Sequence, residues 1–143
     1  MRMFADKHPI CLNKVEKGEL GEFVATCYLQ KRGWREIERN ARIGGCELDI
    51  VAYDPDGVMV VVEVKFCEKT GDGYSPESHL NLRKVRAVAR GAQMFADKHP
   101  KLAGRGFRVD AICLSPRDPA VLTEKEDDYV INYYKNILSS FAE

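Results

Sequence analysis

The most regular hydrophobic pattern in the chain lies between residues 47 and 66, where two apolar segments are joined by a short polar one. The apolar segments Leu48–Tyr53 and Val58–Phe66 are rich in valine, a residue that favours strands. The sequence DPDG at Asp54–Gly57 is typical of a tight turn, because proline presets the first corner and glycine accepts a left-handed backbone. The pattern therefore predicts an antiparallel hairpin with a three-residue loop closed by a bulge.

This turn sets the register of the hairpin, with Asp54 opposite Val58. Since side chains alternate across a strand, one face is expected to be wholly apolar. That face carries Leu48, Ile50, Ala52, Val58, Val60, Val62, Val64 and Phe66. The other face carries apolar residues near the turn (Val51, Tyr53, Met59 and Val61) and charged residues at its open end (Glu47, Asp49, Glu63 and Lys65).

The charged end admits two interpretations. The register puts Asp49 opposite Glu63 and Glu47 opposite Lys65, with opposed Cβ atoms roughly 4.5–5.5 Å apart. Two carboxylates at that separation repel each other, so one takes up a proton or a cation joins them. A hard divalent ion such as Mg²⁺ suits carboxylate oxygens, and Lys65 would then steady a water or a phosphate oxygen. The alternative is a cross-strand ion-pair cluster without a metal.

Helical spacing appears on both sides of this hairpin. Residues 16–32 place apolar side chains on one stripe, Gly33 supplies a stop, and Glu22 lies at the edge of the stripe. Ser75 and the proline after it offer a helix start before a long amphipathic segment. Four basic residues of that segment, Arg83, Lys84, Arg86 and Arg90, lie off its apolar stripe. They indicate either a solvated face or a surface that follows phosphates.

The remaining segments complete an α/β or α+β layered fold. Residues 34–43 and 107–114 are predicted strands, and residues 130–141 fit a strand or a helix. We expect residues 1–15 to form an N-terminal extension and residues 16–143 a single domain. The heptapeptide MFADKHP occurs at Met3–Pro9 and again at Met94–Pro100, and we have no physical account of the repeat.

Composition narrows the class of protein. The chain has 143 residues, of which 45% are hydrophobic and 31% charged, as in an ordinary globular domain. The formal net charge of zero argues against a protein that coats nucleic acid without specificity, while leaving room for a local basic patch. Five scattered cysteines without CxxC spacing argue against a disulfide framework or a zinc site. Since we find neither a membrane-length apolar run nor a signal-peptide pattern, we expect a cytoplasmic protein without a membrane partner.

Several short motifs taken together resemble the PD-(D/E)xK nuclease superfamily. They are the helical Glu22, then Asp49, and fourteen residues later Glu63-Val64-Lys65. More narrowly, the chain resembles the YraN-like family of small, largely uncharacterised bacterial proteins, which are similar to archaeal Holliday-junction resolvases. Further matching pieces are Gly21, Ala25, Tyr28-Leu29, Gly33, Asn40, Arg42, Glu47-Leu48, Ile50, Val62, Lys84 and Arg108-Val109-Asp110.

The resemblance implies a restriction-endonuclease-like core, with a mixed sheet flanked by helices, that uses Mg²⁺ or Mn²⁺ to hydrolyse phosphodiester bonds. Asp49 and Glu63 would hold the metal, with the Val64 carbonyl as a further ligand. Lys65 would position the nucleophile, and Glu22 would bind a water or a second ion. For Glu47 two roles stay open: it pairs with Lys65, or it only caps the end of the sheet.

The leading hypothesis is thus a metal-dependent endonuclease acting on DNA, with branched or otherwise structured DNA as the expected substrate. The expected DNA-binding residues are Arg42, Arg83, Lys84, Arg86 and Arg90. A second hypothesis is a nucleic-acid-binding or adaptor protein that kept the nuclease fold without turnover. Resolvase-like relatives commonly act as dimers, so the sequence also leaves a homodimer open.

Overall fold

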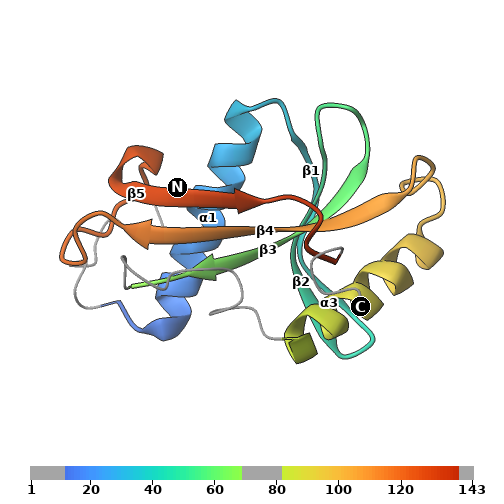
Figure 1. Ribbon diagram of the computed structural model, residues 1–143, viewed down its shortest axis with the longest axis horizontal. Coiled ribbons are helices and arrows are strands. Elements are labelled where there is room, and N and C mark those ends of the chain that lie inside the picture. The colour runs from blue at the N-terminus through green and yellow to red at the C-terminus, as the bar shows by residue number, and fades with distance from the viewer. Residues whose placement is uncertain (1–11, 69–81, 139–143) are drawn as a thin grey trace.

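The computed structural model describes residues 12–68 and 82–138 (Figure 1). Within these ranges the chain forms two α-helices, five strands and one short 3-10 helix. In chain order they are α1 (Lys14–Lys31), β1 (Arg35–Ile43), β2 (Cys46–Tyr53), β3 (Met59–Phe66), α3 (Leu82–Lys98), β4 (Phe107–Pro116), η2 (Glu126–Asp128) and β5 (Tyr129–Tyr134).

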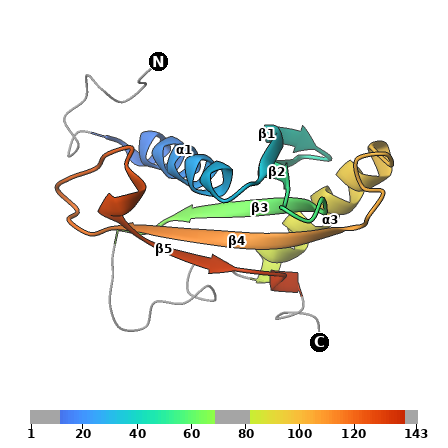
Figure 2. The same cartoon turned by 90° about the horizontal axis from the view of Figure 1, so that it is seen from above.

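The five strands form one mixed sheet in the order β1-β2-β3-β4-β5. Neighbouring strands are antiparallel except β3 and β4, which are parallel and joined through the segment that contains α3. β3, β4 and β5 run side by side, with α1 to one side of them (Figure 2). The predicted mixed α/β fold is confirmed, and this arrangement is consistent with a restriction-endonuclease-like core.

Alternating positions of β2 and β3 enter two separate hydrophobic clusters, so α1 and α3 cover opposite faces of the sheet. Ile50 and Val62 pack with Leu20 and Val24 of α1, whereas Val51 and Val61 pack with the apolar face of α3. This confirms the alternation predicted for the body of the hairpin. Both faces of the central strands are therefore dry, and the charged residues gather where these strands end.

The prediction for Leu48 was wrong. It was assigned to the face shared with Ile50, but it packs in the cluster beneath α3. A Cβ atom built on Gly91 of α3 would lie 3.1 Å from Leu48 Cδ2, which shows how closely the helix approaches β2 there. Strict alternation fails because the strand is distorted between Leu48 and Ile50, at Asp49.

The distortion has a counterpart in the neighbouring strand. The β1–β2 pairs pass from Arg39–Ile50 to Ala41–Leu48, so Asn40 lies opposite Asp49. Asn40 has a φ of 53°, an uncommon conformation that asparagine tolerates better than most residues. The backbone of β1 is therefore bent beside Asp49.

Helix α1 is defined at both ends by local signals. Asn13 accepts the N–H of Glu16 at 2.8 Å, and the Asn13 N–H donates to Glu16 Oε1 at 3.1 Å, forming a capping box. The chain leaves the helix through Gly33, with a φ of 90°. The predicted helix over residues 16–32 is confirmed within two residues, and Glu22 is half-buried on it.

The predicted hairpin turn is also confirmed. The Asp54 N–H donates to the Val58 carbonyl at 3.0 Å, the Gly57 N–H donates to the Asp54 carbonyl at 2.9 Å, and Gly57 has a φ of 83°. Pairing then runs in the expected register from Tyr53–Met59 to Ile50–Val62. The loop length on which the position of Asp49 depends is therefore correct.

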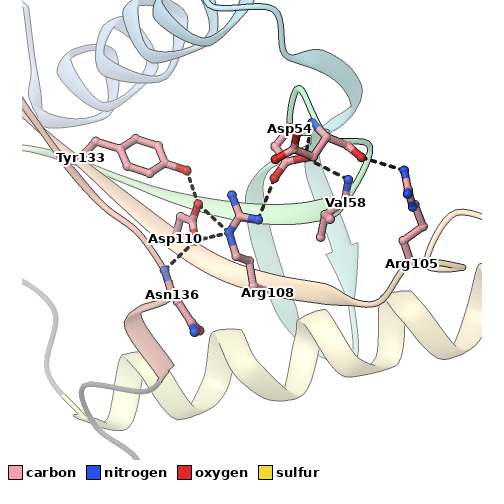
Figure 3. A network of polar contacts seen from close by, with 8 residues as sticks. Asp54, Val58, Arg105, Arg108, Asp110, Tyr133 and Asn136 are labelled. Atoms are coloured by element: carbon pink, nitrogen blue, oxygen red, sulfur yellow. Dashed lines mark hydrogen bonds and ion pairs between the residues drawn. The ribbon is translucent and has the colours of Figure 1, made fainter.

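A polar network ties this turn to the far side of the sheet (Figure 3). Arg108 of β4 donates to Asp54 at 2.7 Å and, through Nε, to Asp110 at 3.1 Å. The fully buried Asp110 also accepts the Tyr133 hydroxyl and the Asn136 N–H. The network links the turn, β4 and the end of β5, and it satisfies a carboxylate with no exposure to solvent.

Three other expectations have partial outcomes. The segment that fitted a strand or a helix begins as the strand β5, while residues 139–143 lie outside the described residues. Cys67 and Cys113 are buried thiols, Cys27 and Cys46 are half-buried thiols, and Cys11 lies outside the described ranges. The first copy of the repeated heptapeptide and the predicted helix start at Ser75 also lie outside them, whereas the second copy closes α3.

Candidate functional site

The candidate site forms where β2 and β3 stop pairing. In the hairpin register, Val64 is the next residue after Val62 whose N–H would donate to β2. That N–H instead donates to the side chain of Asp49, at 2.8 Å from Oδ2. The carboxylate of Asp49 thus replaces the backbone partner and ends the ladder.

The carboxyl groups of Asp49 and Glu63 lie together at this end. Burial and then the neighbouring Glu63 raise the pKa of Asp49 to about 8, while the Val64 N–H opposes the shift. Glu63 itself is 3% exposed, and its Oε1 is a buried oxygen without a hydrogen-bond partner in the described structure. A buried carboxylate oxygen left unpaired is costly, so this atom is suited to a cation or a shared proton.

Lys84 supplies a positive charge to this acid pair from α3. Its Nζ lies 3.0 Å from Glu63 Oε2, and its side chain remains 56% exposed. The negative charge of Glu63 is the main reason that the pKa of Lys84 is raised. The amine expected from the sequence to contact nucleic acid is therefore engaged with a candidate metal ligand.

Glu22 reaches the same acids from the opposite face of the sheet. Burial, then the charges of Asp49 and Glu47, raise the pKa of Glu22 to about 7, while Arg39 and a hydrogen bond with Asn40 oppose the shift. Because pairing has ended, side chains from α1 and α3 meet at Asp49 although their helices lie on opposite faces. Glu22 is thus close enough to Asp49 and Glu47 for their charges to act on it, and the role that the resemblance implies for it stays a prediction.

A cavity of about 390 Å³ opens between the β1–β2 turn and α3. Its lining includes Glu47, Asp49, Lys84 and Arg90. The floor is close-packed, since a Cβ on Gly91 would lie 3.1 Å from Cys46 Sγ. The cavity thus gives a ligand access to Asp49, between the Gly44-Gly45 turn and a basic face of α3.

The five residues expected to bind nucleic acid do not form one cluster. At 100° per residue, Arg83, Arg86 and Arg90 lie on one exposed edge of α3. Arg90 also lines the cavity, whereas Arg42 projects from β1 with 85% of its side chain exposed and pairs with Glu47 at 3.5 Å.

Lys65 lies at a second cavity, of about 490 Å³. It lines this cavity together with Lys14 and Lys17 of α1 and with Glu68. The described β2–β3 ladder ends before Glu47 and Lys65, so the predicted cross-strand pair is not formed, and Glu47 pairs with Arg42. The prediction that Glu47 lies opposite Lys65 was wrong, because Asp49 accepts the Val64 N–H and the β2–β3 pairing ends at Ile50–Val62, three residues earlier on each strand.

The donor set can be compared with what a divalent cation needs. Asp49 and Glu63 supply adjacent carboxylates and one orphaned oxygen, a combination suited to Mg²⁺ or Mn²⁺ with waters completing the shell. Among residues 12–68 and 82–138, however, no three His, Cys, Asp or Glu side chains are grouped as ligands. The residues fit a cation held by two carboxylates, and Glu22 lies outside the immediate ligand group.

Sequence comparison places the chain in a family. The model of the uncharacterised protein family UPF0102 matches residues 21–114. The chain belongs to this family. The UPF0102 match begins within α1, at Gly21, and extends through the hairpin and α3 to Leu114 near the end of β4. It therefore includes Glu22, Asp49, Glu63, Lys65 and Lys84 and confirms the YraN-like resemblance, whereas membership of the nuclease superfamily stays a prediction.

Individual UPF0102 relatives cover most of the fold. A protein of Persephonella marina is 40% identical over 98 residues, covering 68% of this chain and 82% of its own length. One of Trichlorobacter lovleyi is 40% identical over 101 residues, covering 71% and 78%. One of Carboxydothermus hydrogenoformans is 29% identical over 127 residues, covering 89% and 98%.

Among solved structures, Pyrococcus furiosus SfsA in complex with Ca²⁺ aligns with a TM-score of 0.30 and 14% identity. The alignment covers 84% of this chain and 63% of that one. In the described part of the chain, neither helix combines the length and apolar composition needed to cross a membrane.

Two features of the site were missed from the sequence. The Lys84–Glu63 ion pair joins residues twenty-one positions apart on two different elements, so no periodicity within one element could show it. The bend at Asn40 had a weak signal, since an asparagine inside a strand-like segment is a candidate for positive φ.

Proposed function

We propose that this UPF0102 protein is a metal-dependent phosphodiesterase that cleaves DNA, with branched or structured DNA as the expected substrate. The observation that supports it most is the pair of carboxyl groups on Asp49 and Glu63. Glu63 keeps a buried oxygen without a hydrogen-bond partner in the described structure, and Asp49 lines a cavity that Lys84 and Arg90 also line. Carboxylates held together at such a cost to stability are typical of ion-binding and catalytic sites.

Each residue has a stated part in this proposal. Asp49 and Glu63 would hold a Mg²⁺ or Mn²⁺ ion, with the Val64 carbonyl as a further ligand. A bound divalent cation would supply a Lewis acid for the phosphate and make a bound water more acidic. Lys65 would orient the attacking water, and Glu22, with its raised pKa and its hydrogen bond to Asn40, would hold a second water or ion.

The basic edge of α3 has a separate part. Arg83 and Arg86 are exposed and follow the rim of the cavity along the helix. We assign Arg83, Arg86 and Arg90, with the more distant Arg42, to contacts with the phosphate backbone, which position nucleic acid without reading its sequence. A homodimer would extend this surface and belongs to the same proposal.

The test is cleavage by purified protein with Mg²⁺ or Mn²⁺ on linear duplex, flap and four-way-junction substrates. We expect Asp49→Ala and Glu63→Ala to reduce cleavage by at least about a hundredfold, because each removes a ligand of the cation that would stabilise the negative charge developing on the phosphate. Asp127→Ala, which removes an exposed acid from η2, should cleave as the wild type does. Cleavage that persists in Asp49→Ala would rule out this site.

The second candidate function is a nucleic-acid-binding or adaptor protein without turnover. It is favoured by the ion pair in which Lys84 already occupies Glu63 and by the lack, among the described residues, of three grouped ligands. In this case no substrate is cleaved with either metal, and Asp49→Ala binds DNA as tightly as the wild type. The same substrate panel, read by both cleavage and gel shift, separates the two functions.

A further inference from the structure

Within the described residues, Glu63 forms an ion pair with Lys84. Glu63 is 3% exposed, and its two oxygens are in different situations: Oε2 lies 3.0 Å from Lys84 Nζ, and Oε1 is buried without a hydrogen-bond partner. Only one of the two carboxylate oxygens of Glu63 therefore has a polar partner in the described structure. One oxygen of Glu63 is neutralised by the amine, and the other is buried without a hydrogen-bond partner there.

A divalent cation and the lysine amine need the same carboxylate. A cation shared by Asp49 and Glu63 is repelled by a positive charge 3.0 Å from Glu63 Oε2. Without either cation, the two carboxylates face only each other in a buried place, which is strongly unfavourable. Lys84 thus stabilises the acid pair and at the same time opposes metal binding.

We propose that Lys84 is a built-in counterion that competes with a divalent cation for Glu63 and must leave this carboxylate when the cation binds. The inference rests on the proposed function, because it concerns the same acid pair. It adds a residue that tunes metal affinity, which no spacing in the sequence indicates.

The surroundings of Lys84 allow this exchange. Its side chain is 56% exposed, lies on a helix rim and lines the cavity of about 390 Å³. A lysine has a flexible four-carbon stem, so Nζ can turn into the cavity without a movement of α3. There the amine joins Arg90 and becomes a contact for an incoming phosphate. Loss of the Glu63 ion pair and gain of a phosphate contact are thereby coupled.

The experiment compares Lys84→Met with Arg90→Met. Both remove one positive charge from α3 at the same cavity, but Arg90 lies six residues on, about 9 Å along the helix, whereas Lys84 is the residue paired with Glu63 in the described structure. Manganese affinity is measured by titration calorimetry, and the melting temperature is measured in EDTA and with Mn²⁺. Lys84→Gln is carried in parallel as an uncharged polar replacement.

We expect Lys84→Met to bind Mn²⁺ about tenfold more tightly than the wild type, because a close opposing charge is gone. Its melting temperature in EDTA should fall by about 3 °C, since Glu63 loses its counterion, and the rise on adding Mn²⁺ should be larger than in the wild type. Arg90→Met should change Mn²⁺ affinity by less than about twofold, as expected for a more distant, solvated charge.

The outcomes separate this inference from the proposed function. Tighter binding in Lys84→Met and Lys84→Gln but not in Arg90→Met, including binding that appears only in the Lys84 variants, supports the competition. Unchanged or weaker Mn²⁺ binding in Lys84→Met, or equal gains in Lys84→Met and Arg90→Met, overturns it while leaving the metal site itself standing. An absence of Mn²⁺ binding in the wild type and in both Lys84 variants overturns the competition and the proposed metal-dependent function together.

Discussion

The carboxyl group of Asp49 accepts the Val64 N–H at 2.8 Å while lying against the carboxyl group of Glu63. The first contact stabilises the fold, because it satisfies a strand N–H that has lost its backbone partner. The second destabilises it, because two buried acids cannot both carry a charge without a counterion. A single residue thus serves both the end of the hairpin and the candidate site.

At the residue scale we predict that Asp49→Asn stabilises the metal-free protein at pH 8–9. The amide oxygen can still accept the Val64 N–H, while the repulsion with Glu63 disappears. The gain should be on the order of 1 kcal/mol in the free energy of unfolding. Urea denaturation in EDTA measures it.

Asp127→Asn on the exposed η2 helix is the matched control and should change the free energy of unfolding by less than about 0.5 kcal/mol. A loss of stability in Asp49→Asn would show that the charged hydrogen bond to Val64 outweighs the repulsion. The assignment of Asp49 as a strained acid would then be wrong.

At the scale of elements, the register of β2 against β3 depends on a turn that is also anchored by a residue of β4. Asp54 is 7% exposed, and its carboxylate accepts hydrogen bonds from the N–H groups of Asp56 and Val58, each at 2.9 Å. It also accepts a hydrogen bond from the Arg108 guanidinium. The turn is therefore anchored to β4 as well as formed by its own sequence. A slip of one residue here would move Asp49 away from Glu63.

We predict that Asp54→Asn destabilises the protein by about 2 kcal/mol at pH 7, because a buried pair with Arg108 loses its charge. Burial alone would raise the pKa of Asp54, but the Val58 N–H and Arg108 outweigh it, and the pKa lies below its ordinary value. A carboxyl group whose pKa is lower in the folded state stabilises the protein at pH values above its unfolded-state pKa of about 3.9. That stabilisation is lost as the pH falls through the folded-state pKa. Denaturation at pH 7 and at pH 3 measures the difference.

The gap between wild type and Asp54→Asn should therefore narrow below pH 4. Asp56→Asn is the control in the same turn, because the Asp56 side chain is exposed and the described contacts use its backbone. Equal losses in the two variants would contradict the anchoring role of Arg108.

At the scale of the whole molecule, equal numbers of acidic and basic residues hide a strong local separation of charge. The chain has 22 of each, yet acids gather where the central strands part, and arginines follow the exposed edge of α3. A net charge of zero therefore does not exclude binding to a polyanion, because attraction depends on the local field.

We predict that Arg83→Ala combined with Arg86→Ala weakens DNA binding and lowers the salt dependence. Each lost phosphate contact reduces the slope of log K against log salt by about 0.9, so the double variant should lose up to about 2. Fluorescence anisotropy at salt concentrations from about 50 to about 200 mM measures the DNA affinity and its slope against salt.

Lys101→Ala combined with Lys125→Ala removes two exposed positive charges elsewhere and serves as the control. A similar reduction of the salt slope in both double variants would mean that binding depends on total charge. The exposed edge of α3 would then not be the DNA-binding surface.

Much of the framework could be predicted from local chemistry. The turn at Asp54–Gly57 predicted the hairpin register, and the apolar spacing of residues 16–32 with Gly33 as a stop predicted the extent of α1, because these features depend on neighbouring residues. Leu48 and Glu47 were placed wrongly because strict alternation assumes an unbroken strand, and the bend opposite Asn40 breaks it.

By itself, the sequence determined which acids lie on adjacent strands, since turn length and alternation decide that from local geometry. Only the tertiary structure decided what surrounds those acids: Glu22 arriving from one face, Lys84 from the other, and Lys65 beside a different cavity. The physical reason is that such contacts depend on where β2 and β3 separate and on how closely α3 packs over Gly91. Neither quantity is carried by any short stretch of the chain.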